Sequence, residues 1–161
     1  MIKLKKFNYK KVYYKVVNDE ERHNGLQYKT GLVTDVIPFN SDPAASCVPG
    51  GIYFTTLDYI GQFYKLGNKI RPLTIPKDCK DVLPDPSGDK FRAKSVYMKE
   101  AFPKEKIFEL MPDKIKGSLD LGGCDLKGIK LPQSVGGSLY LGGCDLKGIK
   151  LPQNLINKVI S

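Results

Sequence analysis

The sequence predicts an α+β fold in two parts: a mixed N-terminal domain with few helices over residues 1–110, and a short C-terminal parallel β-solenoid with a cap over residues 111–161. The second part is predicted by a twenty-residue block that occurs twice in tandem, because a short fixed period is typical of stacked coils. Residues 117–130 and 137–150 differ only where Asp120 is replaced by Tyr140. The first part is predicted by non-repetitive β-forming runs separated by turn residues, with one helical pattern among them.

The strands of the first part are predicted from runs of β-branched and aromatic residues. These runs lie at residues 12–17, 32–39, 69–75 and 93–98, and a further buried strand follows the turn that begins at Cys47. Turn residues separate them at Asn24-Gly25, at 40–43 and at 85–89.

One helix is predicted between Thr56 and Gly67. The Thr56 hydroxyl can accept a free amide of the first turn. Leu57, Ile60, Phe63 and Tyr64 then supply an apolar helical face. Gly67 is expected to end the helix in a left-handed conformation.

The repeat predicts its own register, in which residue n lies over residue n+20. Ile115, Val135 and Leu155 follow this spacing. By strand alternation, Leu119 and Leu121 should point inward and Asp120 or Tyr140 outward. Residues 151–161 should cover the last coil, giving either a capped monomer or, as the favoured alternative, a symmetric dimer through the last coils.

Several short segments of the first part resemble a known viral family. They follow one another in the order HNGLQY (23–28), GL (31–32), PFN (38–40), CVPGGIYFT (47–55), FY (63–64) and DPSGDK (85–90). Over about residues 10–100 the chain resembles the N-terminal domain that precedes ankyrin repeats in proteins of mimivirus-like giant DNA viruses. The resemblance implies a viral protein made inside an amoebal host, with no known catalytic activity. After residue 110 the twenty-residue repeats stand where that family has ankyrin repeats.

The repeats carry two further resemblances, which leave their coil geometry open. Residues 119–126 and 139–146 fit LxLxxCxL, which resembles a leucine-rich repeat. The preceding Leu-Pro pairs resemble the short repeats of bacterial effector proteins. Residues 124–128 also fit a pentapeptide repeat, although Gly136 interrupts its five-residue series of leucines. Both alternatives predict parallel β-stacking.

Composition limits the classes of protein that remain. The net charge is +9, but arginine is scarce, so any nucleic-acid binding should be weak and independent of sequence. No apolar run is long enough to cross a membrane, and the N-terminus lacks the apolar core of a signal peptide. The four scattered cysteines have no CxxC spacing, which argues against a zinc ribbon and a disulfide framework. We therefore expect the host cytoplasm or the virion, not secretion.

The sequence shows no catalytic or metal-binding constellation, and no cofactor is expected. His23 is the only histidine, and no phosphate-binding loop occurs. A degenerate ADP-ribosyltransferase-like domain is an alternative, but Glu100 would be a forced choice for its acid. Cys124 and Cys144 lie on adjacent coils and are expected to pack as small apolar residues.

The function predicted is a non-enzymatic interaction module whose repeat face binds a host or viral protein. The alternatives are a basic virion or nucleic-acid-associated protein and the degenerate enzyme domain. A homodimer through the C-terminal coil is a further possible assembly. The candidate binding residues on the repeats are Tyr140, Asp120, Lys127, Lys147, Lys130 and Lys150.

Overall fold

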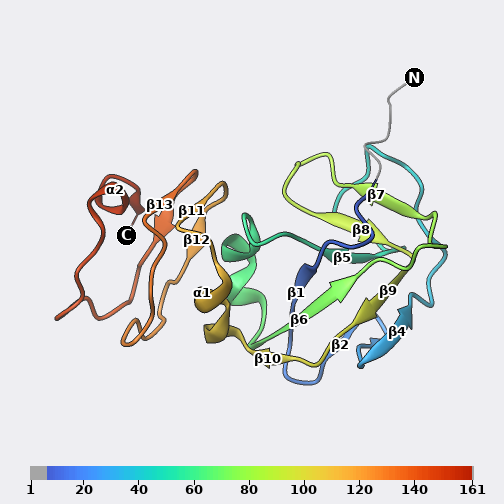
Figure 1. Ribbon diagram of the computed structural model, residues 1–161, viewed down its shortest axis with the longest axis horizontal. Helices are drawn as coiled ribbons and strands as arrows, with labels where there is room; N and C mark the ends of the chain where they lie inside the picture. The colour runs from blue at the N-terminus through green and yellow to red at the C-terminus, as the bar shows by residue number, and fades with distance from the viewer. Residues whose placement is uncertain (1–6, 161) are drawn as a thin grey trace.

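The computed structural model describes residues 7–160, which form a β-rich part and a repeat part joined by short helices. Figure 1 shows the β-rich part at one end, the repeats at the other, and α1 (Ile107–Leu110) at the junction. None of the helices within residues 7–160 is long and apolar enough to cross a membrane.

The main sheet of the β-rich part runs in the order β1-β6-β9-β4, and β10 also pairs with β6. All of its pairings are antiparallel, with Tyr13 opposite Leu73 and Val33 opposite Val96. The strands are β1 (Tyr13–Val17), β4 (Gly31–Thr34), β6 (Lys69–Thr74), β9 (Ser95–Met98) and β10 (Phe102–Pro103). The strands predicted at 12–17 and 69–75 are thus confirmed, each one residue shorter than predicted.

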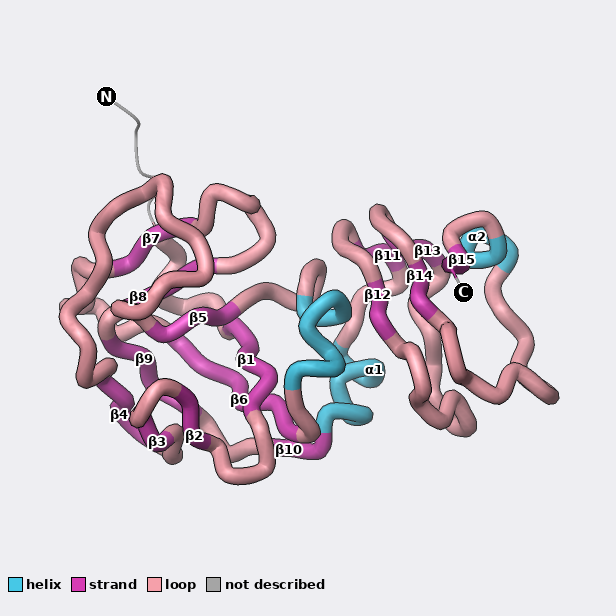
Figure 2. Tube along the Cα trace, turned by 180° about the vertical axis from the view of Figure 1, so that it is seen from behind, coloured by secondary structure: helices cyan, strands magenta, loops and turns pink. Residues whose placement is uncertain are grey.

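A second antiparallel sheet runs in the order β5-β8-β7, and a hairpin pairs β2 with β3 (Figure 2). Their bounds are β2 (Arg22–His23), β3 (Leu26–Gln27), β5 (Ile52–Phe54), β7 (Val82–Pro84) and β8 (Phe91–Ala93). Asn24 and Gly25 form the two-residue hairpin loop, and both have positive φ as a tight primed turn requires. Tyr13, Phe54 and Phe91 pack together between the sheets, with ring centroids 5.1 to 5.8 Å apart.

The predicted helix forms later and with a different geometry. The segment is a 3-10 helix, η1 (Ile60–Leu66), and the Thr56 hydroxyl makes no capping hydrogen bond. The backbone carbonyl of Thr56 instead accepts from the amides of Tyr59 and Ile60. Gly67 is extended, with φ −173°, so the predicted left-handed end is wrong. A Cβ atom at Gly67 would lie 2.1 Å from the Val17 carbonyl oxygen, and this close approach explains the glycine.

Two predicted strand boundaries are also wrong. The strand expected to reach residue 39 ends at Thr34, where the buried Asp35 carboxylate accepts the amides of Ile37 and Gly51 and turns the chain. The strand expected over 93–98 is divided between β8 and β9, because the Lys94 amide donates to the Asp81 carbonyl and separates them.

The repeats pair in parallel at a spacing of twenty residues. Leu119 lies opposite Leu139 and Asp120 opposite Tyr140, while Leu139 lies opposite Val159. The strands form two ladders, β11-β13 and β12-β14-β15. Their bounds are β11 (Lys114–Ile115), β12 (Leu119–Asp120), β13 (Ser134–Val135), β14 (Leu139–Tyr140) and β15 (Val159–Ile160). The class of coil, leucine-rich or pentapeptide-type, stays a prediction.

Gly136, which interrupts the pentapeptide series, marks a close contact between successive repeats. A Cβ atom there would lie 2.1 Å from the carbonyl oxygen of Lys116, the equivalent residue one repeat earlier. The Gly136 amide donates to the Ile115 carbonyl at 2.9 Å. The glycine therefore lets the second repeat approach the first.

The first repeat packs against the helices that precede it. Its buried leucines share one apolar cluster with Ile60 and Tyr64 of η1 and with Ile107 and Phe108 of α1. Within the described residues, one further short helix, the 3-10 turn η2 (Lys104–Lys106), lies directly before α1. The N-terminal part thus covers one end of the repeats.

Residues 151–160 cover the other end only in part. They form α2 (Gln153–Ile156) and β15, and Leu155 is fully buried. Ile156 and Ile160 stay 49% and 45% exposed. A dimer through this end stays a prediction.

Candidate functional site

The residues that the sequence singles out on the strands of the repeats lie side by side. Leu119 and Leu139 are fully buried, so their neighbours Asp120 and Tyr140 point outward, as predicted. Ile160 continues the same line, because it pairs with Tyr140 in the parallel ladder. Asp120, Tyr140 and Ile160 are called the outer row below. Tyr140 is 40% exposed and Ile160 45% exposed.

The four candidate lysines lie outside the strands, on the turns of the repeats. All four are exposed; Lys127 and Lys130 lie between β12 and β13, and Lys147 and Lys150 lie between β14 and β15. The backbone amides of Lys127 and Lys147 donate to the carboxylates of Asp125 and Asp145, both at 3.0 Å, so the two turns are closed in the same way. The lysines thus occupy equivalent places on successive repeats, and none of them belongs to the outer row.

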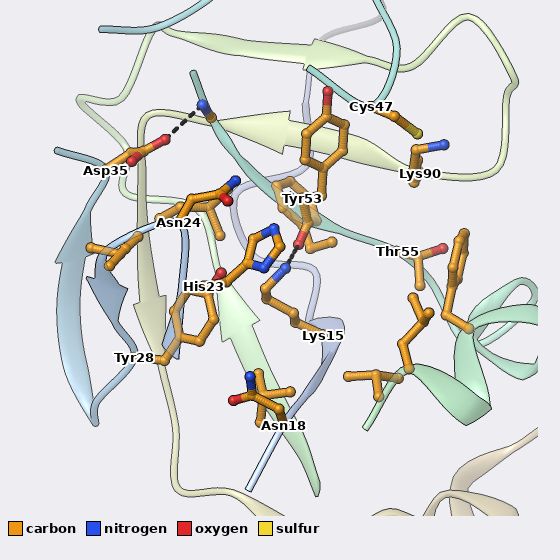
Figure 3. Close-up of a pocket in the computed structure, with 18 of the residues that line it drawn as sticks. Lys15, Asn18, His23, Asn24, Tyr28, Asp35, Cys47, Tyr53, Thr55 and Lys90 are labelled. Carbon is orange, nitrogen blue, oxygen red and sulfur yellow. Dashed lines mark hydrogen bonds between the residues drawn. The ribbon is translucent and has the colours of Figure 1, made fainter. Parts of the chain in front are cut away.

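A pocket in the N-terminal part has no counterpart among the sites predicted from sequence. It has a volume of about 490 Å³ and is lined by residues of β1, the β2–β3 hairpin, the loop and strand at 47–55, η1 and Lys90. Figure 3 shows Lys15, His23, Tyr28 and Tyr53 around its centre. Three of the segments that carry the viral resemblance, 23–28, 47–55 and 85–90, therefore meet at one cavity.

Lys15 is the most unusual group in this pocket. Its ammonium donates to the Tyr53 carbonyl at 2.8 Å and lies 5.3 Å from the centroid of the Tyr28 ring. Burial lowers the pKa of Lys15 to about 8, because the charged amine has lost much of its water. Burial, together with the charge of Asp35, raises the pKa of Tyr28 to about 12, so its hydroxyl is neutral at physiological pH.

The wall opposite the hairpin is fixed by hydrogen bonds within the protein. The Asp35 carboxylate accepts the Gly51 amide at 2.8 Å. The Tyr53 hydroxyl lies 3.1 Å from the Val48 amide, which donates to it. These bonds hold the 47–55 segment in place, so the pocket is a formed feature of the fold.

The Asp85–Asp89 turn is also held firmly beside the pocket. Burial acts to raise the pKa of Asp85, but hydrogen bonds from Ser87 and Ser46 and the charge of Lys90 outweigh it and lower that pKa. Lys90 lies 3.6 Å from Asp85 and 3.7 Å from Asp89, so its charge is already paired.

The cysteines do not form a metal site or a disulfide in the described residues. All four are free thiols, and residues 7–160 contain no group of three or more ligands suited to a metal. The Cys144 thiol donates to the Leu121 carbonyl at 2.9 Å, which ties the second repeat to the first. Glu100 is exposed and does not line the pocket.

The pocket has little signal in the sequence. The pattern around His23 indicates a surface residue of a polar turn, and His23 is indeed exposed, yet it lines the cavity. Lys15 is one of many N-terminal lysines and carries no distinguishing pattern. Only the joint occurrence of the segments at 23–28, 47–55 and 85–90 points to a shared place in the fold.

Comparison with known proteins finds related viral proteins but no matching family model. No family model matches the chain, and no solved structure matches it. A putative ankyrin repeat protein of Acanthamoeba polyphaga mimivirus is 33% identical over 108 residues, which cover 65% of this chain and 54% of that relative. An uncharacterized protein of the same virus is 39% identical over 71 residues, 44% of this chain and 51% of its own length. A second putative ankyrin repeat protein is 29% identical over 96 residues, 58% of this chain and 29% of its own.

The chain spans about half the length of the first two of these relatives. Its relation to proteins of a giant virus, two of them named for ankyrin repeats, is thereby confirmed. The assignment of residues 10–100 to one particular domain of those proteins stays a prediction.

Proposed function

We propose that this chain is a non-enzymatic protein-interaction module whose repeats form a short solenoid and whose outer row binds a host or viral protein. The observation that carries the proposal is the outer row itself, Asp120, Tyr140 and Ile160, aligned on three parallel strands with its last two members exposed. Neighbouring strands lie about 4.8 Å apart, so three such side chains form a continuous strip.

The strip is suited to binding because its backbone is rigid. Leu119 and Leu139 are fully buried beneath it, and Leu121 and Leu141 anchor the next positions. Tyrosine offers a large contact area with little loss of conformational entropy, which makes Tyr140 the natural anchor. Relatives named for ankyrin repeats support the same class of function, since repeat arrays present extended binding surfaces.

The charge of the repeats favours an acidic partner. The turns carry four lysines, at 127, 130, 147 and 150, against two carboxylates, Asp125 and Asp145, so they have an excess of positive charge. Complementary charge raises the association rate and helps to fix the orientation of a partner. The partner is therefore proposed to be a protein with an acidic surface around an apolar or aromatic contact.

Replacing Tyr140 with aspartate should remove the partner without unfolding the protein. Tyr140 is exposed, so its loss should change stability by only about 0.5 kcal/mol. An interface anchor of this kind is typically worth about 2 kcal/mol or more in binding, roughly a thirtyfold loss of affinity. The measurement is quantitative affinity capture from virus-infected amoebal cells, using the wild-type chain and the Tyr140→Asp variant as bait.

The matched control is Tyr97→Asp, which places the same substitution at a 48% exposed tyrosine on strand β9 of the N-terminal part. A protein retained by the wild type and by Tyr97→Asp, but lost with Tyr140→Asp, is the expected result. If both variants retain the same proteins as the wild type, the outer row is not the contact surface.

A further inference from the structure

We propose that the pocket around Lys15 is a binding site for a small organic anion, a carboxylate or phosphate carried on an apolar body, with Lys15 as its counter-ion. The site lies in the N-terminal part, away from the outer row, and does not depend on the proposed protein-binding function.

The Lys15 ammonium has only one hydrogen-bond partner within the described residues. It donates to the Tyr53 carbonyl, and no carboxylate of residues 7–160 lies within 4.0 Å of it. An ammonium has three donors, so two remain for a ligand. Its pKa of about 8 is that of a cation that has lost water but is still mostly protonated at neutral pH. Lys15 is partly buried, and a charge that has lost part of its water is stabilised by a counter-ion, which an anionic ligand would supply.

The balance of charge around Lys15 also favours an anion. Arg71 lies directly across from it on β6, but Glu21 pairs with Arg71 at 2.8 Å. Asp35 is the one carboxylate among the described residues that line the cavity, and Lys90 is paired with its neighbouring carboxylates.

Arg22 and His23 also line the pocket, from the β2–β3 hairpin. Among the described residues that line the cavity, Lys15 and Arg22 are thus two cations without a carboxylate within 4.0 Å, against the single carboxylate of Asp35. The other titratable groups of the lining are Tyr14, Tyr28, Tyr53 and Cys47, and the Tyr53 hydroxyl is directed away from Lys15, toward Val48.

The size and the walls of the cavity suit a small organic molecule. A volume of about 490 Å³ falls in the range of roughly 300–1,000 Å³ that is typical of ligand pockets. The apolar side chains of Ile52, Ile60 and Phe63 line it together with the polar groups. An inorganic anion alone would leave this apolar wall in contact with water, so the geometry favours an anion with an apolar body.

Lysine-detected NMR tests the site without knowledge of the natural ligand. The full chain is labelled with [6-¹³C]lysine, and the CεH₂ signal of Lys15 is followed during titration with benzoate and with phenyl phosphate. Benzamide serves as the neutral probe of the same shape as benzoate. The expected result is a saturable shift of the Lys15 signal with at least one of the two anions, and at least tenfold weaker binding of benzamide.

The bound anion should also raise the pKa of Lys15 above its free value, because a nearby negative charge favours the protonated amine. Binding should therefore weaken as the pH rises from about 7 to about 10, where Lys15 loses its proton. Lys77 is the internal control. It is exposed between β6 and β7 and does not line this pocket, so its signal should stay unchanged.

Lys15→Met should weaken anion binding at least tenfold, whereas Lys77→Met should leave it intact, as read from tyrosine ring signals at the pocket. If Lys15→Met does not fold, the wild-type titration decides alone. The proposal would be overturned if benzamide bound as tightly as the anions, or if Lys15→Met bound the anions as tightly as the wild type. It would also be overturned if neither anion shifted the Lys15 signal at about 10 mM, a concentration that would saturate a millimolar site.

Discussion

Replacing Arg92 with methionine is expected to destabilise the N-terminal part by about 3–5 kcal/mol, because several hydrogen bonds from a charged group are lost at once. The guanidinium is fully buried and donates to the backbone carbonyls of Asn40 and Ala45 at 3.1 and 2.9 Å, and to that of Asp42. Arg92 therefore holds the 40–45 loop onto β8. Methionine fills similar space but offers no donor.

Urea denaturation of the two proteins measures this effect. Arg92→Lys should be intermediate, because an ammonium cannot reproduce the planar spread of the guanidinium donors. Arg22→Met is the matched control, since Arg22 is exposed on the β2–β3 hairpin. A loss below about 1 kcal/mol for Arg92→Met would contradict the anchoring role of the guanidinium and would show that water replaces it at these carbonyls.

The second large effect compares two leucines in identical local sequences. Leu126 and Leu146 are equivalent residues of the two repeats, yet Leu126 is 3% exposed and Leu146 is 42% exposed. Leu126→Asp should destabilise the repeats by about 4 kcal/mol or more, because it buries an unpaired charge in the cluster shared with η1 and α1. Leu146→Asp should cost no more than about 1 kcal/mol, because water still reaches that position.

The pair isolates the effect of neighbours from that of local sequence. Both variants change the same residue within the same Gly-Gly-Cys-Asp-Leu-Lys-Gly segment. Chemical denaturation followed by circular dichroism gives the two free energies of unfolding. Equal losses at the two positions would contradict the burial of the first repeat against the N-terminal part.

The strands and turns that depend on local sequence can be predicted from the sequence. The runs at 12–17 and 69–75 form β1 and β6, because their β-branched and aromatic side chains suit a pleated, half-buried surface. The inward position of Leu119 and the outward position of Tyr140 follow from strand alternation. The turn at Asn24-Gly25 follows from residues that tolerate positive φ.

Features set by tertiary contacts could not be predicted. Gly67 looks like a helix end, but its role is to let the chain approach Val17, which lies far earlier in the sequence. The end of β4 depends on amides that donate to Asp35, one of them from Gly51. The repeats read alike, so the different burial of Leu126 and Leu146 has no local signal.

The pocket cannot be predicted from the sequence either, because it also depends on tertiary contacts. Lys15 and Tyr53 are 38 residues apart in sequence, and their hydrogen bond exists only because β1 and β5 meet through the Tyr14–Thr55 bridge. Tyr140 and Asp120, by contrast, could be placed together from the repeat spacing alone. The candidate residues on the repeats can therefore be predicted from the sequence, whereas the cavity cannot.

Site-specific photo-cross-linking tests most directly whether the outer row touches a partner protein. A photoreactive phenylalanine analogue is placed at position 140, at position 160 or, as control, at position 97, and the proteins are illuminated in virus-infected amoebal cells. We expect positions 140 and 160 to cross-link to the same acidic protein and position 97 not to do so. Cross-links to that protein from position 97 alone, or from none of the three positions, would contradict the claim.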